Sequence, residues 1–72
     1  MGSHSSPTRR NIQNLLFNPD PEQRRIAAEG LGRATLPIAN EGDALEALTM
    51  AMNDRHMAVQ ETAFQSLVRL SV

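Results

Sequence analysis

The sequence of 72 residues contains no cysteine, lysine, tryptophan or tyrosine, and its two phenylalanines are Phe17 and Phe64. Without cysteine, the fold has neither disulfide bonds nor thiolate metal sites to hold it together. No apolar run approaches the roughly 20 residues that a membrane-spanning helix needs, so we expect no membrane partner. Two phenylalanines also offer little surface on which nucleic-acid bases could stack.

The first six residues, 1–6, lack the apolar segment of a signal peptide. They resemble an expression scar or a disordered lead-in, and we expect residues 7–72 to form a single domain. Because neither a signal peptide nor a membrane segment is evident, a cytoplasmic location is the default expectation. A chain of this size buries only about 60% of its unfolded surface, so we expect marginal stability.

The sequence also lacks a catalytic or ligand-binding signature. His4 and His56 are the only histidines, and His56 has no second ligand four residues away, so we expect no metal site and no cofactor. Ser66 has no base within helical reach, which argues against nucleophilic hydrolysis. Gly30 and Gly32 fall inside a predicted helix rather than after a strand, so they form no phosphate-binding loop. The sequence therefore predicts a protein that is not an enzyme.

The clearest positive signal is a turn that leads into an amphipathic helix. Pro19 and Pro21 move the residues before them out of the helical region. Asp20 is therefore the predicted N-cap, and Pro21 is the first helical residue. Small and apolar residues then recur at helical spacing and form one stripe, which consists of Ile26, Ala27, Gly30, Leu31 and Ala34. A small residue at Gly30 lets a neighbouring helix approach closely, whereas Gly32 lies off the stripe.

A weaker copy of this pattern occurs near the C-terminus. When Asn18 is aligned with Asp54, the two copies are 36 residues apart (54 − 18). The matched pairs include Ala27 with Ala63, Leu31 with Leu67, Arg33 with Arg69, and Gly30 with Ser66. Turn, small and large positions agree in order, which favours an internal repeat.

Helical periodicity extends along the chain, and no strand pattern is present. We expect a first helix over 7–17, a second from Pro21 to about Ala34, a third from a cap at Asn40 or Asp43 to about Asn53, and a fourth over about 55–70. In the longest connection, Leu36 and Ile38 are expected to be buried. Met52, together with Met57 or Ala58, is expected to face the core. The predicted fold class is all-α, with four helices in two antiparallel hairpins.

The two units resemble HEAT repeats, in particular the bacterial subtype also seen in phycobilisome lyases. That subtype has a run similar to Asp-Pro-Asp-Pro-Glu-Val-Arg and then Ala-x-x-Ala-Leu-Gly, which residues 18–24 and 27–32 fit closely, with Gln23 in place of valine. The second unit departs further, because Gln60 replaces arginine and Val68 replaces glycine. The resemblance covers about residues 11–70. It implies two stacked helical hairpins, repeat 1 at about 7–34 and repeat 2 at about 41–70, as a short α-solenoid or bundle.

Repeat arrays usually need three or more units to bury a continuous core, and this chain has two. The chain is therefore a fragment of a longer array, or a partner or a second copy covers its open face, or its flanks act as caps. The net charge is −1, but residues 1–36 carry five arginines against three carboxylates, whereas residues 37–72 carry two against five. This separation of charge favours head-to-tail association.

Partner-binding candidates follow from the resemblance, because second helices line the concave side of such stacks. The off-stripe polar residues there are Arg24, Arg25 and Glu29 in one unit, and Gln60, Glu61 and Gln65 in the other. Arg24 has a structural alternative, since at its family position the arginine often bonds an aspartate of the neighbouring repeat, here Asp54. Met50 lies off its stripe in a cluster of flexible methionines and is a further candidate.

The leading functional hypothesis is a non-enzymatic protein–protein interaction or scaffold module. Its partner would be another protein, a neighbouring domain of a longer chain, or a second copy. Nucleic-acid binding is the alternative, with Arg9, Arg10, Arg24 and Arg25 as phosphate contacts, although the net charge opposes it. A lyase-like or chaperone-like role is a weaker alternative that the resemblance alone suggests.

Overall fold

The computed structural model describes residues 7–34 and 38–71. These ranges contain four helices and no strand, so the predicted all-α class is confirmed. The helices are α1 (Pro7–Phe17), α2 (Pro21–Arg33), α3 (Ile38–Ala51) and α4 (Met57–Ser71). The expected lead-in at 1–6 and the expected burial of Leu36 and of the Ile38 side chain lie outside what is described.

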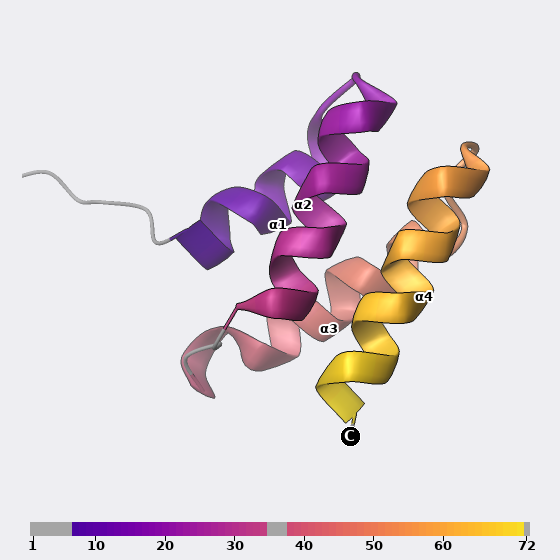
Figure 1. Cartoon of the computed structure of the whole chain (residues 1–72). Coiled ribbons are helices and arrows are strands. Elements are labelled where there is room, and N and C mark those ends of the chain that lie inside the picture. Colours follow the sequence, from indigo (N-terminus) through magenta and orange to yellow (C-terminus); the bar gives the residue numbers. More distant parts are fainter. Residues whose placement is uncertain (1–6, 35–37, 72) are drawn as a thin grey trace, which may run out of the picture.

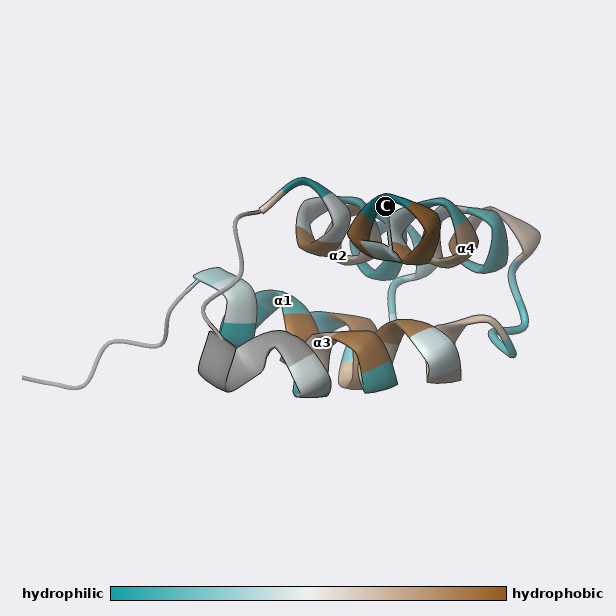
Figure 2. Cartoon of the chain, turned by 90° about the horizontal axis from the view of Figure 1, so that it is seen from below, coloured by the Kyte–Doolittle hydropathy of each residue, from teal (hydrophilic) through white to brown (hydrophobic). Residues whose placement is uncertain are grey.

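α1 and α2 form the first hairpin, and α3 and α4 form the second. The two hairpins lie side by side, so that the four helices make two layers. α1 contacts both α2 and α3, and α4 contacts both α2 and α3. Figure 2 shows α1 and α3 in one layer and α2 and α4 in the other. α2 and α4 lie next to each other along much of their length, and α4 is at the edge of its layer (Figure 1).

α1 and α2 begin where the sequence predicts, and the cap of α2 is the expected one. The Asp20 carboxylate accepts a hydrogen bond from the Glu22 N–H at 3.0 Å, and Pro21 is the first residue of α2. The Asn18 side chain accepts from the Asp20 N–H at 2.9 Å, which fixes the turn before the cap. The prolines and the short polar side chains thus determine where the first hairpin turns.

The starts of the other two helices differ from expectation. α3 begins at Ile38, so Asn40 and Asp43 lie inside the helix and neither caps it. Asn and Asp cost under about 0.7 kcal/mol in a helix interior, which is too little to end one. α4 begins at Met57, because the Asp54 carboxylate accepts from the His56 N–H at 2.9 Å and holds a turn there.

The core is built mostly from alanine. The buried hydrophobic residues are Leu15, Ala27, Ala28, Leu31, Ala44, Ala47, Leu48, Ala51, Val59 and Ala63. Small side chains let the helices approach closely, and α2 buries Ala27 and Ala28 because it packs against both α1 and α4. This second neighbour shifts the buried stripe of α2, so the inward position expected for Ile26 is wrong and its side chain is 45% exposed.

The methionines next to the second turn were also expected in the core, and this prediction is wrong. Met52 is 39% exposed and Met57 is 69% exposed. Ala58, the alternative to Met57, is exposed as well. Met52 follows the last residue of α3, and Met57 begins α4, so both residues lie at helix ends where the core no longer surrounds them.

A close contact between the two hairpins lies at Gly32. A Cβ atom at this position would come within 2.8 Å of the Ser66 Cα atom, closer than real side chains pack. Ser66 is buried, and its hydroxyl donates to the Ala28 carbonyl at 2.6 Å. At Gly30, where the sequence suggested a close approach, the nearest atom to a Cβ would be the side-chain amide nitrogen of Asn11 in α1 at 2.7 Å, the end of a flexible side chain. Gly32, off the predicted stripe, therefore brings α2 and α4 together.

Candidate functional site

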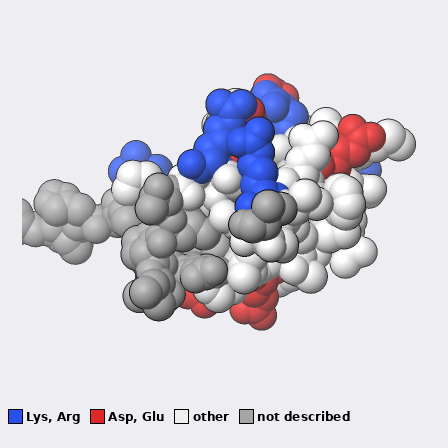
Figure 3. Space-filling model, turned by 60° about the horizontal axis from the view of Figure 1, so that its bottom comes forward, with Lys and Arg blue, Asp and Glu red and all other residues white. Residues whose placement is uncertain are grey.

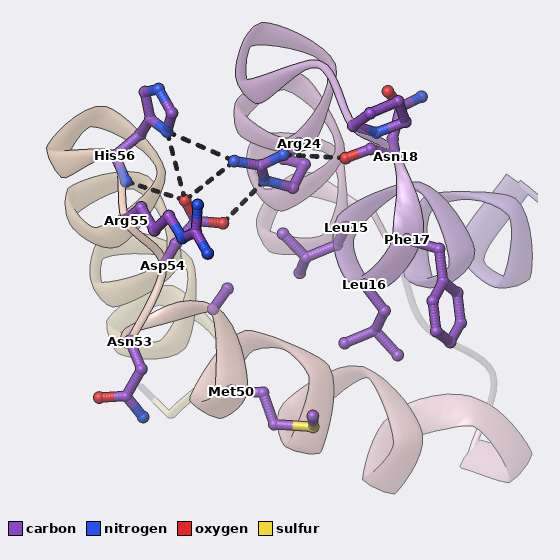
Figure 4. Close-up of a pocket in the computed structure, with 12 residues that line it drawn as sticks. Leu15, Leu16, Phe17, Asn18, Arg24, Met50, Asn53, Asp54, Arg55 and His56 are labelled. Carbon is purple, nitrogen blue, oxygen red and sulfur yellow. Dashed lines mark hydrogen bonds and ion pairs between the residues drawn. The ribbon is translucent and has the colours of Figure 1, made fainter.

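Arg24 connects the turn of one hairpin to the turn of the other. Its Nε and Nη2 atoms donate to the Asp54 carboxylate at 2.8 and 3.1 Å, and Nη1 donates to the Asn18 carbonyl at 2.9 Å (Figure 4). His56 Nδ1 lies 3.4 Å from Nη2. Both members of the ion pair are largely buried, and this geometry fits the structural alternative for Arg24.

The surroundings of Asp54 favour its charged form. Burial alone raises the pKa of Asp54, but the hydrogen bond from Arg24, the His56 N–H and the charge of the guanidinium together outweigh that effect. The pKa of Asp54 therefore lies below its usual value of 3.8. Asp54 stays ionised near neutral pH and ties the two hairpins together.

The two turns use the same hydrogen bonds at the 36-residue spacing. Asn18 and Asp54 each accept from the N–H two residues later, at 2.9 Å in both turns. Arg24 donates to the Asn18 carbonyl, and its counterpart Gln60 donates to the Asp54 carbonyl. Only Arg24 also reaches the aspartate of a following unit. Gln60 is thus held in the same way at the open end of the stack.

A first groove lies between the two turns, with a volume of about 450 Å³. Its walls include Leu16, the exposed Phe17 and Met50, and the turn residues Arg55 and His56 (Figure 4). Met50 is 57% exposed, as expected from its place off the stripe. The groove brings Met50 together with Arg24, and none of the other candidate residues lines it.

A second, smaller groove of about 170 Å³ runs between α2 and α4. It brings together Arg25, Glu29 and Gln65, all three of which were predicted from the sequence. Arg25 pairs with Glu22 at 2.6 Å and with Glu29 at 3.4 Å. The hydrogen bond from Arg25 lowers the pKa of Glu22. Figure 3 shows a few acidic atoms beside the gathered basic ones, and the two ion pairs of Arg25 place carboxylates next to its positive charge.

A third groove, of about 330 Å³, lies on the outer face of α4. The predicted residues Gln60, Glu61 and Gln65 line it together with Met52 and Phe64. Phe64 is 55% exposed. One turn further along, Val68 is 46% exposed. We define the outer face of α4 as the surface formed by Met52, Gln60, Glu61, Phe64, Gln65 and Val68.

The sequence-based list missed the apolar part of this surface. Phe64 was considered as an aromatic residue for base stacking, and Val68 was noted only for its departure from the family pattern. The 36-residue register contains the missing signal, because it matches Phe64 with Ala28 and Val68 with Gly32. Large side chains on α4 thus stand where α2 has small ones that α4 covers.

Two classes of site are not found in the described residues. No group of three or more His, Asp or Glu side chains there could hold a metal ion. No described helix is long and apolar enough to cross a membrane. Comparison with models of known protein families, with curated proteins and with solved structures gives no match for this chain.

Proposed function

We propose that this chain is a non-enzymatic protein–protein interaction or scaffold module of the HEAT-repeat type, and that it acts in the cytoplasm. The observation that carries the proposal is the outer face of α4, where Met52, Phe64 and Val68 are exposed beside Gln60 and Glu61. A contiguous apolar patch with a polar rim is typical of a protein-binding surface. Phenylalanine and methionine are enriched at such surfaces, and a few well-packed residues supply most of the binding energy.

The rigid presentation of this face also supports a scaffold role. Val59 and Ala63, on the opposite side of α4, are fully buried in the core. The Arg24–Asp54 pair and the Ser66 hydrogen bond hold α4 against α2. A surface that is fixed before binding loses less conformational entropy when a partner docks.

Nucleic-acid binding is the second candidate, and the geometry disfavours it. Arg24 is engaged with Asp54 and the Asn18 carbonyl, and Arg25 is engaged with two glutamates. Phosphate contacts would have to displace these partners, and the exposed Phe17 and Phe64 lie in different grooves. A lyase-like or chaperone-like role draws on the family resemblance alone.

The test is affinity capture of the tagged protein from its host's lysate, with and without nuclease, followed by mass spectrometry. We expect a nuclease-resistant protein partner that is lost with Phe64→Ser and kept with Met50→Ser, a matched change outside the outer face of α4. Circular dichroism on both variants checks that the fold is intact. Capture that disappears with nuclease, or with Arg25→Glu but not with Phe64→Ser, would contradict the proposal and favour the nucleic-acid alternative.

A further inference from the structure

We propose that the partner of the outer face of α4 is a second copy of this chain. The second copy docks head to tail through the surface formed by Asn18, Ile26 and Gly30, which we call the free side of α2. This inference rests on the proposed interaction function and names its partner. The contact between α2 and α4 within one chain is its template. The outer face of α4 corresponds in the repeat register to the side of α2 that contacts α4, which is the first half of the template. The free side of α2 corresponds to the residues of the second hairpin that contact α2, which are the second half.

The first half consists of the α2 residues that face α4. Arg24 reaches Asp54, the Ala28 carbonyl accepts from Ser66, and Gly32 lies against the Ser66 backbone. The register matches these three residues to Gln60, Phe64 and Val68 on the outer face of α4. All three positions are therefore present at the open end, in the same order along the helix.

The second half consists of the residues of the second hairpin that face α2. Asp54 and Ser66 make the contacts just described, and Thr62 lines the groove between the two helices. Their counterparts in the first hairpin are Asn18, Gly30 and Ile26. Ile26 is 45% exposed, although its neighbour Ala27 is buried. Ile26 is thus an exposed apolar residue at the position where its counterpart Thr62 lies beside a neighbouring helix.

Side-chain sizes on the two ends are complementary. Within the chain, Gly32 on α2 makes room for Ser66 on α4. At the proposed junction the small residue is on the other partner, since Val68 of one copy would meet Gly30 of the next, with the flexible side chain of Asn11 beside it. The Arg24–Asp54 ion pair would be replaced by Gln60 against Asn18, two carboxamides that are able to donate to and accept from each other. The ion pair and the close contact at Gly32 thus each have a counterpart, whereas the Ser66 hydrogen bond to the Ala28 carbonyl has none, because Gly30 has no hydroxyl.

Charge favours the same orientation. The described part of the first hairpin, 7–34, carries five arginines against three carboxylates, and the described part of the second hairpin, 38–71, carries two against five. Head-to-tail docking brings the positive hairpin of one copy to the negative hairpin of the next, whereas α4-to-α4 docking would bring two negative hairpins together. Opposite charges steer encounter, and like charges oppose it.

Sedimentation equilibrium over a wide concentration range tests this junction with two variants that each block one end. Phe64→Glu blocks the outer face of α4, and Ile26→Glu blocks the free side of α2. We expect wild-type protein to grow beyond the dimer as concentration rises, because a head-to-tail contact leaves an open end after each addition. We expect either variant alone to remain monomeric, with self-association at least about tenfold weaker.

An equimolar mixture of the two variants is the decisive sample. One native outer face of α4 and one native free side of α2 remain in it, so the mixture is expected to form a 1:1 dimer and stop there. Met50→Glu makes a similar change away from both ends and is expected to assemble like wild type. Circular dichroism of each variant confirms folding, and both blocking changes are at exposed positions.

Three results would overturn the inference. They are a wild-type protein that stays monomeric, a mixture that stays monomeric although wild type assembles, and Ile26→Glu protein that dimerises alone through α4 against α4. Failure here is distinguishable from failure of the proposed function. If wild type is monomeric but captures another protein in a manner that requires Phe64, the interaction function stands and only the identity of the partner is wrong.

Discussion

α2 and α4 occupy equivalent places in the two hairpins, yet their surfaces differ on the side that points along the stack. On α2 this side carries Ala28 and Gly32, and α4 covers it. On α4 the same side carries Phe64 and Val68, which remain exposed among the described residues. The same helix surface therefore serves two purposes in the two hairpins. Small residues permit a permanent close contact within the chain, and large residues supply area for a separate partner.

The largest loss of stability is expected when Gly32 of α2 is replaced by valine, the residue that α4 has at the matching position, Val68. Gly32→Val places a branched side chain where even a Cβ would lie 2.8 Å from the Ser66 Cα atom. Overpacking of this kind costs about 3 kcal/mol, and thermal unfolding monitored by circular dichroism measures it. Gly30→Val is the matched control. There the nearest atom is the flexible amide end of Asn11, so the loss is expected to be smaller. Equal losses at the two glycines would contradict the contact.

The next effect concerns the polar link between the turns. Arg24→Gln gives α2 the residue that α4 has at Gln60 and leaves the Asp54 carboxylate, whose side chain is 11% exposed, without its ion pair. We expect a loss of about 2 kcal/mol in the free energy of unfolding, measured by urea titration. Arg25→Gln is the control, since its ion pairs are on the surface and should contribute far less. If Arg25 proves the more important, the pairing assigned to Arg24 is wrong.

A smaller effect is expected from the buried hydroxyl between the helices. Ser66→Ala removes the 2.6 Å hydrogen bond to the Ala28 carbonyl. One hydrogen bond contributes about 1 kcal/mol net, which should appear as a lower urea midpoint. Ser71→Ala is the matched control, because its hydroxyl makes a similar bond to the Leu67 carbonyl at an exposed site. Equal losses for the two variants would mean that the bond between α2 and α4 has no special weight.

The smallest effect is expected from acid. Because the folded-state pKa of Asp54 lies below 3.8, the stability from this group is present above the unfolded value and is lost as pH falls through the folded one. Unfolding free energy should therefore decrease below about pH 4. The decrease should be shallower in Arg24→Gln, where the pKa of Asp54 returns toward its usual value. Identical acid profiles for the two proteins would show that Arg24 does not set the pKa of Asp54.

Local signals predicted the first hairpin well. Pro7 and Pro21 begin α1 and α2 in both sequence and structure, and Asp20 is the cap that its position implies. The pairing of Arg24 with Asp54 was also anticipated, because the register and the family pattern brought the two residues together. Features that depend on residues within a few positions of each other are therefore evident in this sequence, and the repeat pattern adds this one pairing between the two hairpins.

Apart from that ion pair, features that depend on the neighbouring helix were not predicted. Ile26 fits the helical stripe, but α2 is covered by α4 on the side of Ala28, so the stripe is rotated. The sequence does not indicate why residue 32 is a glycine, because the reason is the close packing of Ser66 from α4 against it. Met52 has an apolar side chain at the right spacing, yet α3 ends before it. Periodicity identifies an apolar face but does not indicate how many neighbours cover the helix.

The most direct test of the account is a map of which amide signals change when the unmodified protein is concentrated. Two-dimensional ¹H–¹⁵N NMR spectra recorded from dilute to concentrated solution provide that map. We predict concentration-dependent shifts around Gln60, Phe64 and Val68 on α4, accompanied by shifts around Ile26 and Gly30 on α2. Two results would contradict the account: spectra that do not change, and shifts confined to the groove around Met50. Either would show that the outer face of α4 does not bind a second copy in the way that α2 binds α4.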